Sequence, residues 1–138
     1  MPNGIDLILA DHRNVEALFA AFDATGDASV IGLVIDALKA HDDAELAALY
    51  PLIGVVLGDA DMIERASVAH SRVKQQIDVL TTLEGPPLID AFRTLQTLIA
   101  DHATDEEQNM LPALSQRASV QQLEGLGARI LQAKQRVG

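Results

Sequence analysis

Three of the four histidines in this sequence are followed by a glutamate four residues later. The pairs are His12 with Glu16, His41 with Glu45, and His102 with Glu106. On a helix, residues four apart lie one turn above each other, about 6 Å along the axis. Each pair therefore presents an imidazole and a carboxylate side by side, and these are groups that bind transition metal ions.

All four histidines lie on apolar helical faces. His102 and Glu106 share a face with Ile99 and Met110, and His70 lies within the apolar stripe of residues 63–80. Burying a carboxylate is costly unless it is paired or binds a metal ion. The pattern therefore predicts a metal site inside the core. The alternative is a metal-free polar core, in which the same groups satisfy one another.

The supply of ligands limits the kinds of metal centre. Four histidines and two or three carboxylates are more than one tetrahedral zinc ion requires, whereas two metal ions bridged by carboxylates use them naturally. The sequence contains no cysteine, so no thiolate ligand is available. Imidazole and carboxylate suit iron, zinc, manganese or copper.

The hydrophobic periodicity predicts an all-α fold, an antiparallel up-and-down four-helix bundle with a short C-terminal fifth helix. Glycine and proline mark the breaks between helices. The histidines at positions 12, 41, 70 and 102 are 29, 29 and 32 residues apart, each near the middle of its helix. In an antiparallel bundle, all four can meet at one height. The expected helices are residues 3–23, 28–57, 60–83, 87–116 and 119–136.

Composition restricts the classes of partner. The 138 residues are 49% hydrophobic, and we expect one folded domain over residues 1–138. The net charge of −10, without a basic stretch, argues against nucleic acid and anionic membranes as partners. The longest uncharged run, residues 46–58, is shorter than the roughly 20 residues of a membrane span. The lack of cysteine fits a cytoplasmic protein.

The order His12, His41-x3-Glu45, His70, His102-x3-Glu106 resembles the hemerythrin-like, or HHE cation-binding, domain. The residues that follow each His-x3-Glu motif, 48–51 and 109–112, agree with that family. The resemblance implies two iron ions joined by an oxo or hydroxo bridge inside the bundle. It also implies which residues bind them: His12 and His41 one iron, His70 and His102 the other, with Glu45 and Glu106 bridging or capping the pair.

The sequence departs from the oxygen-carrying members of that family at two places. Lys74 stands where they have a second histidine on the third helix. Water, Glu16 or another oxygen ligand is therefore expected to fill the coordination position that this histidine would occupy on the iron. Both Glu106 and Glu107 could supply the last carboxylate, and we expect Glu106 because Glu107 turns further from the apolar stripe.

Three functions follow from these observations. The first is a catalase-like enzyme that disproportionates hydrogen peroxide at an open or oxygen-ligated iron. The second is a non-catalytic module that binds or senses oxygen, nitric oxide or iron. In both, the expected partner is a small diatomic or peroxide ligand. The third is a structural bundle without metal.

Several residues near the motifs have simpler interpretations. Glu16 either binds metal, accepts a hydrogen bond from a ligand histidine, or pairs with Lys74. We expect Lys74 to keep its charge toward solvent, Tyr50 to pack in the core, and Pro51 to bend its helix without ending it. The acidic residues beside the histidines are expected to be solvated; they are Asp11, Asp42, Asp43 and Asp101.

Overall fold

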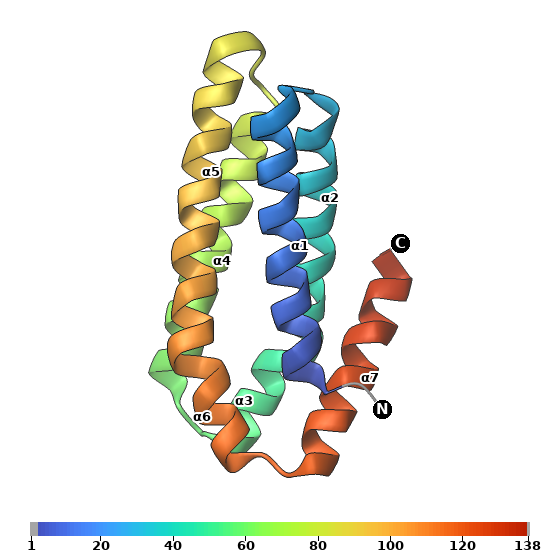
Figure 1. Cartoon of the computed structure of the whole chain (residues 1–138). Coiled ribbons are helices and arrows are strands. Elements are labelled where there is room, and N and C mark those ends of the chain that lie inside the picture. Colours follow the sequence, from blue (N-terminus) through green and yellow to red (C-terminus); the bar gives the residue numbers. More distant parts are fainter. Residues whose placement is uncertain (1–2, 138) are drawn as a thin grey trace.

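Four long antiparallel helical segments form the body of the molecule, as the computed structural model shows (Figure 1). It describes residues 3–137; residues 1, 2 and 138 of the expected domain lie outside this range. The prediction of an all-α bundle with a fifth helix is confirmed, and residues 3–137 contain no strand. In this range no helix is long and apolar enough to cross a membrane. The elements are α1 (Gly4–Thr25), α2 (Ser29–Ala44), η1 (Glu45–Leu49), α3 (Tyr50–Val56), α4 (Ala60–Leu80), α5 (Gly85–Asp105), η2 (Glu106–Met110), α6 (Leu111–Arg117) and α7 (Val120–Val137).

Side-chain caps and glycines fix where the helices begin and end. The Asn3 side chain accepts a hydrogen bond from the Ile5 backbone nitrogen at 2.8 Å, and so caps α1. The turns after α1 and α3 use Gly26 and Gly58, whose φ angles of 63° and 62° favour glycine over residues with a side chain. Asp59 then caps α4 through the Met62 backbone nitrogen. The short connections keep consecutive helices adjacent and antiparallel.

The apolar core consists of two clusters, and the four histidines mark the level between them. One cluster surrounds Phe19 and Phe92 at the end of the bundle where α1 turns into α2. The other surrounds Leu49 and Leu114, near α3, α6 and α7. On α1, Ile8 belongs to one cluster and Val15 to the other, with His12 between them. A polar layer therefore crosses the bundle near its middle.

Two of the long helical segments contain a single π turn, which the sequence analysis did not predict. In η1 the Tyr50 nitrogen bonds to the Glu45 carbonyl, and in η2 the Leu111 nitrogen bonds to the Glu106 carbonyl. Each π turn ends just before a proline, Pro51 or Pro112. A proline ring clashes with the carbonyl four residues earlier in an α-helix, and a wider turn accommodates it. The chain therefore continues past Pro51, as expected, but with one extra residue in the turn.

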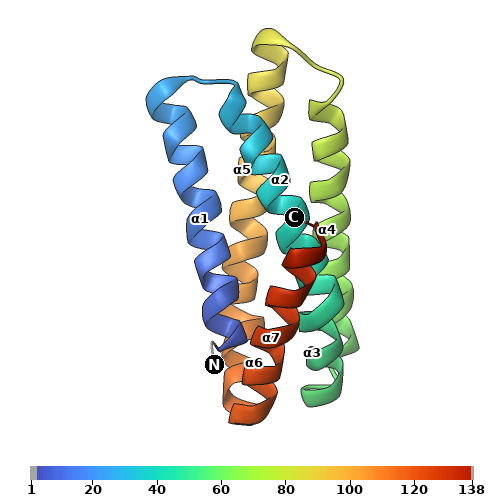
Figure 2. The same ribbon diagram turned by 90° about the vertical axis from the view of Figure 1, so that its right-hand side faces the viewer.

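The fifth helix lies against the outside of the bundle near the N-terminal part of α1 (Figure 2). It packs on α1, α2 and η1. The contact with α1 is close, because a Cβ atom added at Gly4 would lie 2.3 Å from Leu126 Cγ. Among residues 120–135 of α7, the buried ones are Leu123, Leu126, Gly127, Ile130 and Ala133.

Gly4→Ala should destabilise the protein by about 1–3 kcal/mol, because the added methyl group forces Leu126 and α7 away from α1. Gly32→Ala is the matched control, since Gly32 is exposed in α2 with no atom near the added Cβ. The control should stabilise the protein by up to about 1 kcal/mol through helix propensity. Urea unfolding measures both. Equal stabilities for the two variants would contradict the close packing of α7.

Candidate metal centre

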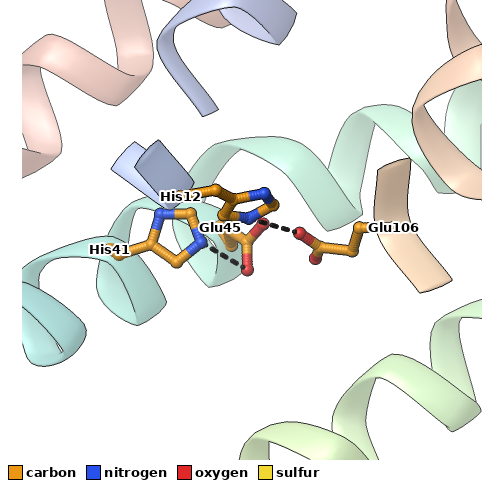
Figure 3. Close-up of side chains that lie close together, drawn as sticks. All are labelled: His12, His41, Glu45 and Glu106. Atoms are coloured by element: carbon orange, nitrogen blue, oxygen red, sulfur yellow. Dashed lines mark ion pairs between the residues drawn. The ribbon is translucent and has the colours of Figure 1, made fainter. Parts of the chain in front are cut away.

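Five buried side chains and the partly buried His102, from four segments of the bundle, converge in the polar layer. His12 comes from α1, His41 from α2 and His70 from α4, while His102 comes from α5. Glu45 and Glu106 each open a π turn and are only 1% and 2% exposed. Figure 3 shows four of these residues pointing toward one another, with dashed lines from His12 to Glu106 and from His41 to Glu45.

The histidines form two pairs. The ring centroids of His12 and His41 are 5.0 Å apart, and those of His70 and His102 are 4.7 Å apart. These are the pairs that the family resemblance implies.

Each glutamate lies between one histidine of each pair. Glu45 Oε1 is 3.3 Å from His41 Nε2 and 2.9 Å from His70 Nε2. Glu106 places Oε1 3.2 Å from His12 Nε2 and Oε2 3.1 Å from His102 Nε2. Both carboxylates therefore lie where they can contact two neighbouring metal ions at once.

The donor atoms fit metal ions better than they fit one another. Several buried atoms have no hydrogen-bond partner within residues 3–137, although buried polar atoms are nearly always paired. Two groups of four residues each offer ligand atoms within 4.8 Å of one another, and Glu45 and Glu106 belong to both groups. Two adjacent cations would satisfy this arrangement. Besides His70 Nδ1, which faces Asp42 at 3.2 Å, the atoms without a hydrogen bond are His12 Nε2, His41 Nε2, Glu45 Oε2, His102 Nε2 and Glu106 Oε1.

Acidic side chains contact the Nδ1 atoms of three of the histidines. Glu107 Oε2 is 2.8 Å from His12 Nδ1, Asp11 Oδ2 is 2.9 Å from His41 Nδ1, and Asp42 Oδ1 is 3.2 Å from His70 Nδ1. Such partners orient a metal-binding histidine and increase its basicity.

The expectation that Asp11 and Asp42 are solvated is therefore wrong. Both are partly buried, because the neighbouring helix brings a histidine to them. Asp43 and Asp101 are exposed, as expected.

Tyr50 contributes a phenol to the polar layer, beyond the core packing that the sequence suggested. Its hydroxyl lies 2.5 Å from His70 Nε2 and donates toward Glu106 Oε2 at 3.0 Å and Glu45 Oε1 at 3.3 Å. On an α-helix, residue 50 would be rotated about 140° from residue 45. The π turn, closed by the bond from the Tyr50 nitrogen to the Glu45 carbonyl, holds more residues per turn than an α-helix, and so brings Tyr50 back toward the face of Glu45.

Glu16 does not join the other candidate ligands. Its side chain is 58% exposed and pairs with Arg13 at 2.9 Å. The reason is helical geometry: His12 already lies toward one side of the buried face of α1, and Glu16 is about 40° further round. The proposed pairing of Glu16 with Lys74 is also absent among the described ion pairs, and Lys74 is exposed as expected.

The buried charges shift one another's pKa values. Burial alone lowers the pKa of His41, but the charge of Glu45, 3.3 Å away, and the hydrogen bond that His41 donates to Asp11 raise it well above its usual range. Burial likewise opposes ionisation of Glu45, yet the His41 charge and the close contacts with the His102, His41 and His70 rings hold its pKa well below its usual range. For Tyr50, burial and the charges of Glu45 and Glu106 raise the pKa. Without metal, the layer is therefore held together by protonated histidines.

A cavity of about 240 Å³ reaches the centre from outside the bundle. His12, His41 and His102 form one side of it, and Arg13, Glu16 and Glu107 belong to its polar part. Its remaining walls are mainly apolar. A small molecule can therefore approach the histidines without unfolding the bundle. The apolar lining residues include Val15, Phe19, Leu38, Val73 and Ile99.

Comparison with known proteins identifies relatives of this chain. The Hemerythrin HHE cation binding domain matches residues 3–114. A solved hemerythrin HHE cation binding domain-containing protein from Mycobacterium kansasii has the same fold, with a TM-score of 0.85 and 21% identity over 99% of this chain and 88% of that one. A protein named DNA nickase from Nostoc sp. is 27% identical over 138 residues. The match includes 96% of this chain but only 39% of that relative.

The metal-free protein should lose stability as the pH rises from 6.5 to 9.5. Burial lowers the pKa of His102, but its close contact with the carboxylate of Glu106 at 3.1 Å and the nearby carboxylate of Glu45 outweigh burial and raise the pKa to about 10. An unfolded histidine titrates near pH 6.5, so the folded state holds the extra proton across this window. Stability is therefore greatest below pH 6.5 and falls by about 1.4 kcal/mol per pH unit for one such proton.

Urea unfolding of chelator-treated protein at several pH values measures this slope. His102→Gln should flatten it, leaving the contribution of His41. A stability that does not change between pH 6.5 and 9.5 would show that His102 is neutral in the metal-free protein.

Proposed function

Because this chain belongs to the hemerythrin HHE cation-binding family, we propose that it holds two iron ions in the polar layer and disproportionates hydrogen peroxide. The observation that carries the proposal is the set of buried nitrogen and oxygen atoms without partners, which face one another beside an accessible cavity. Burying these atoms unpaired is costly, and bound cations remove that cost.

The proposed ligands are six of the seven candidates from the sequence. His12 and His41 would hold one iron, His70 and His102 would hold the other, and Glu45 and Glu106 would contact both. The short distances from each carboxylate to a histidine of either pair support the bridging role. Glu16 is left out because it is exposed and paired with Arg13.

We further propose that Tyr50 supplies the oxygen ligand expected where the family's second histidine on the third helix is missing. Its hydroxyl is within hydrogen-bond distance of His70 and both bridging carboxylates, and so lies beside the His70 and His102 pair. Negative neighbours keep the phenol protonated in the metal-free protein. A bound cation reverses this effect, because it stabilises the phenolate.

Two iron ions supply a two-electron redox couple, so that one peroxide is reduced to two waters and a second is oxidised to O2. The overall reaction, 2 H2O2 → 2 H2O + O2, takes up and releases two protons. Glu107 is placed to exchange them, since it accepts a hydrogen bond from His12 and is 27% exposed at the cavity. Arg13 pairs with Glu107 and holds it there.

The apolar walls of the cavity restrict what reaches the centre. Beyond its polar part, Val15, Phe19 and Ile99 offer no hydrogen-bonding groups, so large polar or charged molecules lose hydration without compensation beside them. Hydrogen peroxide is small and uncharged at neutral pH. The cavity therefore favours peroxide over charged reductants.

The nicking activity named for the Nostoc relative is not proposed for this chain. The matched region is 39% of that protein, and the net charge of −10 in this chain repels the phosphates of DNA.

Protein purified without added metal should contain two irons per chain and evolve O2 from H2O2. Elemental analysis and an oxygen electrode measure the two quantities. Ile99→Phe partly fills the cavity, and should keep both irons while lowering the rate several-fold. Glu16→Gln is the matched control at the exposed part of the cavity and should keep its irons.

Other outcomes point to different functions. Two bound irons without O2 evolution above free iron, together with a spectral change when the reduced protein meets oxygen or nitric oxide, would favour the binding or sensing module. A folded protein that takes up no metal would favour the structural bundle.

Tyr50→Phe tests the phenolate ligand. A phenolate bound to ferric iron absorbs visible light, so the iron-loaded protein should show this band and the variant should lose it while retaining His-bound iron. The variant keeps the buried ring and so preserves packing. An unchanged visible spectrum in Tyr50→Phe would limit Tyr50 to a hydrogen-bonding role.

A further inference from the structure

Helix α7 lies beyond the region matched by the family, which ends at residue 114. It packs on α1, α2 and η1, the three segments that carry His12, His41 and Glu45. Gly4 of α1 leaves room for Leu126 of α7, so the two helices lie in close contact. One side of the proposed centre is thus supported by a helix that supplies none of its ligands.

A chain of polar contacts connects α7 to this side of the centre. Lys134 of α7 binds Asp11 Oδ1. The other carboxylate oxygen of Asp11 is 2.9 Å from His41 Nδ1. The Nε2 atom of His41 faces Glu45 at 3.3 Å and has no hydrogen-bond partner of its own. Lys134 and Asp11 are 123 residues apart in sequence, so only folding of α7 onto the bundle brings them together.

The contacts are well placed to fix the His41 ring. The side chain of Asp11 is 19% exposed and that of Lys134 is 30% exposed, so water screens their interaction less than that of a surface pair. Lys134 holds Asp11 from outside the bundle, and Asp11 then sets the rotation of the imidazole. The corresponding partner of His12, Glu107, is held by Arg13 of α1 and needs no contact from α7.

We propose that α7 is a positioning element for the metal ion bound by His12 and His41, acting through Lys134 and Asp11. This inference rests on the proposed two-metal centre. Lys134 and Asp11 are positioning residues, since neither contacts the metal ion. The two metals of the centre should therefore differ in their dependence on α7, with the His70 and His102 side independent of it.

Opposite changes of charge distinguish this role from simple packing. Asp11→Asn removes the negative charge next to His41 Nδ1. This weakens electron donation from His41 to its iron and should raise the reduction potential of that iron. Lys134→Met removes the positive charge that balances the Asp11 carboxylate, and should therefore lower the reduction potential of the same iron. Both variants loosen the His41 ring. Because such outer partners commonly contribute 10–100-fold to metal affinity, Asp11→Asn should accelerate release of one iron by about that factor.

The experiment loads the full-length variants with ferrous iron and follows removal by a chelator, with two irons per chain as the starting point. Wild type should release both irons slowly, whereas Asp11→Asn and Lys134→Met should release one iron quickly and one slowly. Lys134→Arg retains the cation and should restore slow release. Arg129→Met is the control, because Arg129 is an exposed cation on the same helix. Potentiometric titration of each protein gives the potentials.

Two outcomes would overturn the inference. One is release of both irons at the wild-type rate in Asp11→Asn and Lys134→Met, and the other is a shift of the potential in the same direction in both. If the wild-type protein binds no iron, the proposed two-metal centre is wrong, and the inference about α7, which rests on it, is wrong as well. Circular dichroism and urea unfolding show whether each variant is folded, and Asp11→Asn provides the test should Lys134→Met unfold.

Discussion

The cost of placing six ionisable side chains, five of them buried, at one level of the bundle dominates this structure. Two carboxylates and four imidazoles lie between two apolar clusters, where each charge needs a partner. In the metal-free protein, protons on His41 and His102 supply the compensating charge. Metal ions in the same place would replace these protons. The same layer thus serves folding and metal binding, and both depend on the contacts of Glu45 and Glu106 with the histidines.

The π turns determine which side chains after the glutamates reach that layer. A histidine and a glutamate four residues apart share a helical face, but an α-helix turns the fifth residue after the glutamate away. The wider turn after Glu45 brings Tyr50 back toward the centre, and proline two positions beyond the turn favours that geometry. The second π turn repeats the pattern after Glu106, where Leu111 replaces the tyrosine. The centre is therefore asymmetric, with a phenol on one side only.

Periodicity was sufficient to predict the helices, because it depends on repeats within one helix. The convergence of the four histidines with Glu45 and Glu106 followed from their mid-helix positions in an antiparallel bundle with short connections. Glu16 has the same spacing from His12, yet it is exposed, since the position of His12 on its buried face cannot be read from spacing alone. The partners Asp11, Asp42 and Glu107 depend on contacts between helices. Tyr50 could have been found from the repeated His-x3-Glu-x5-Pro pattern, had the proline been interpreted as a π turn.

The division of the apolar core into two clusters has a consequence for cooperativity. Without metal, the four helical segments are joined to one another at the layer by hydrogen bonds and ion pairs, which water can replace when the helices separate. Ligands from four different helical segments on a shared pair of ions would connect those segments by bonds that no single helix can break alone. Binding of metal ions in the polar layer would thus determine whether the bundle unfolds locally or only as a whole.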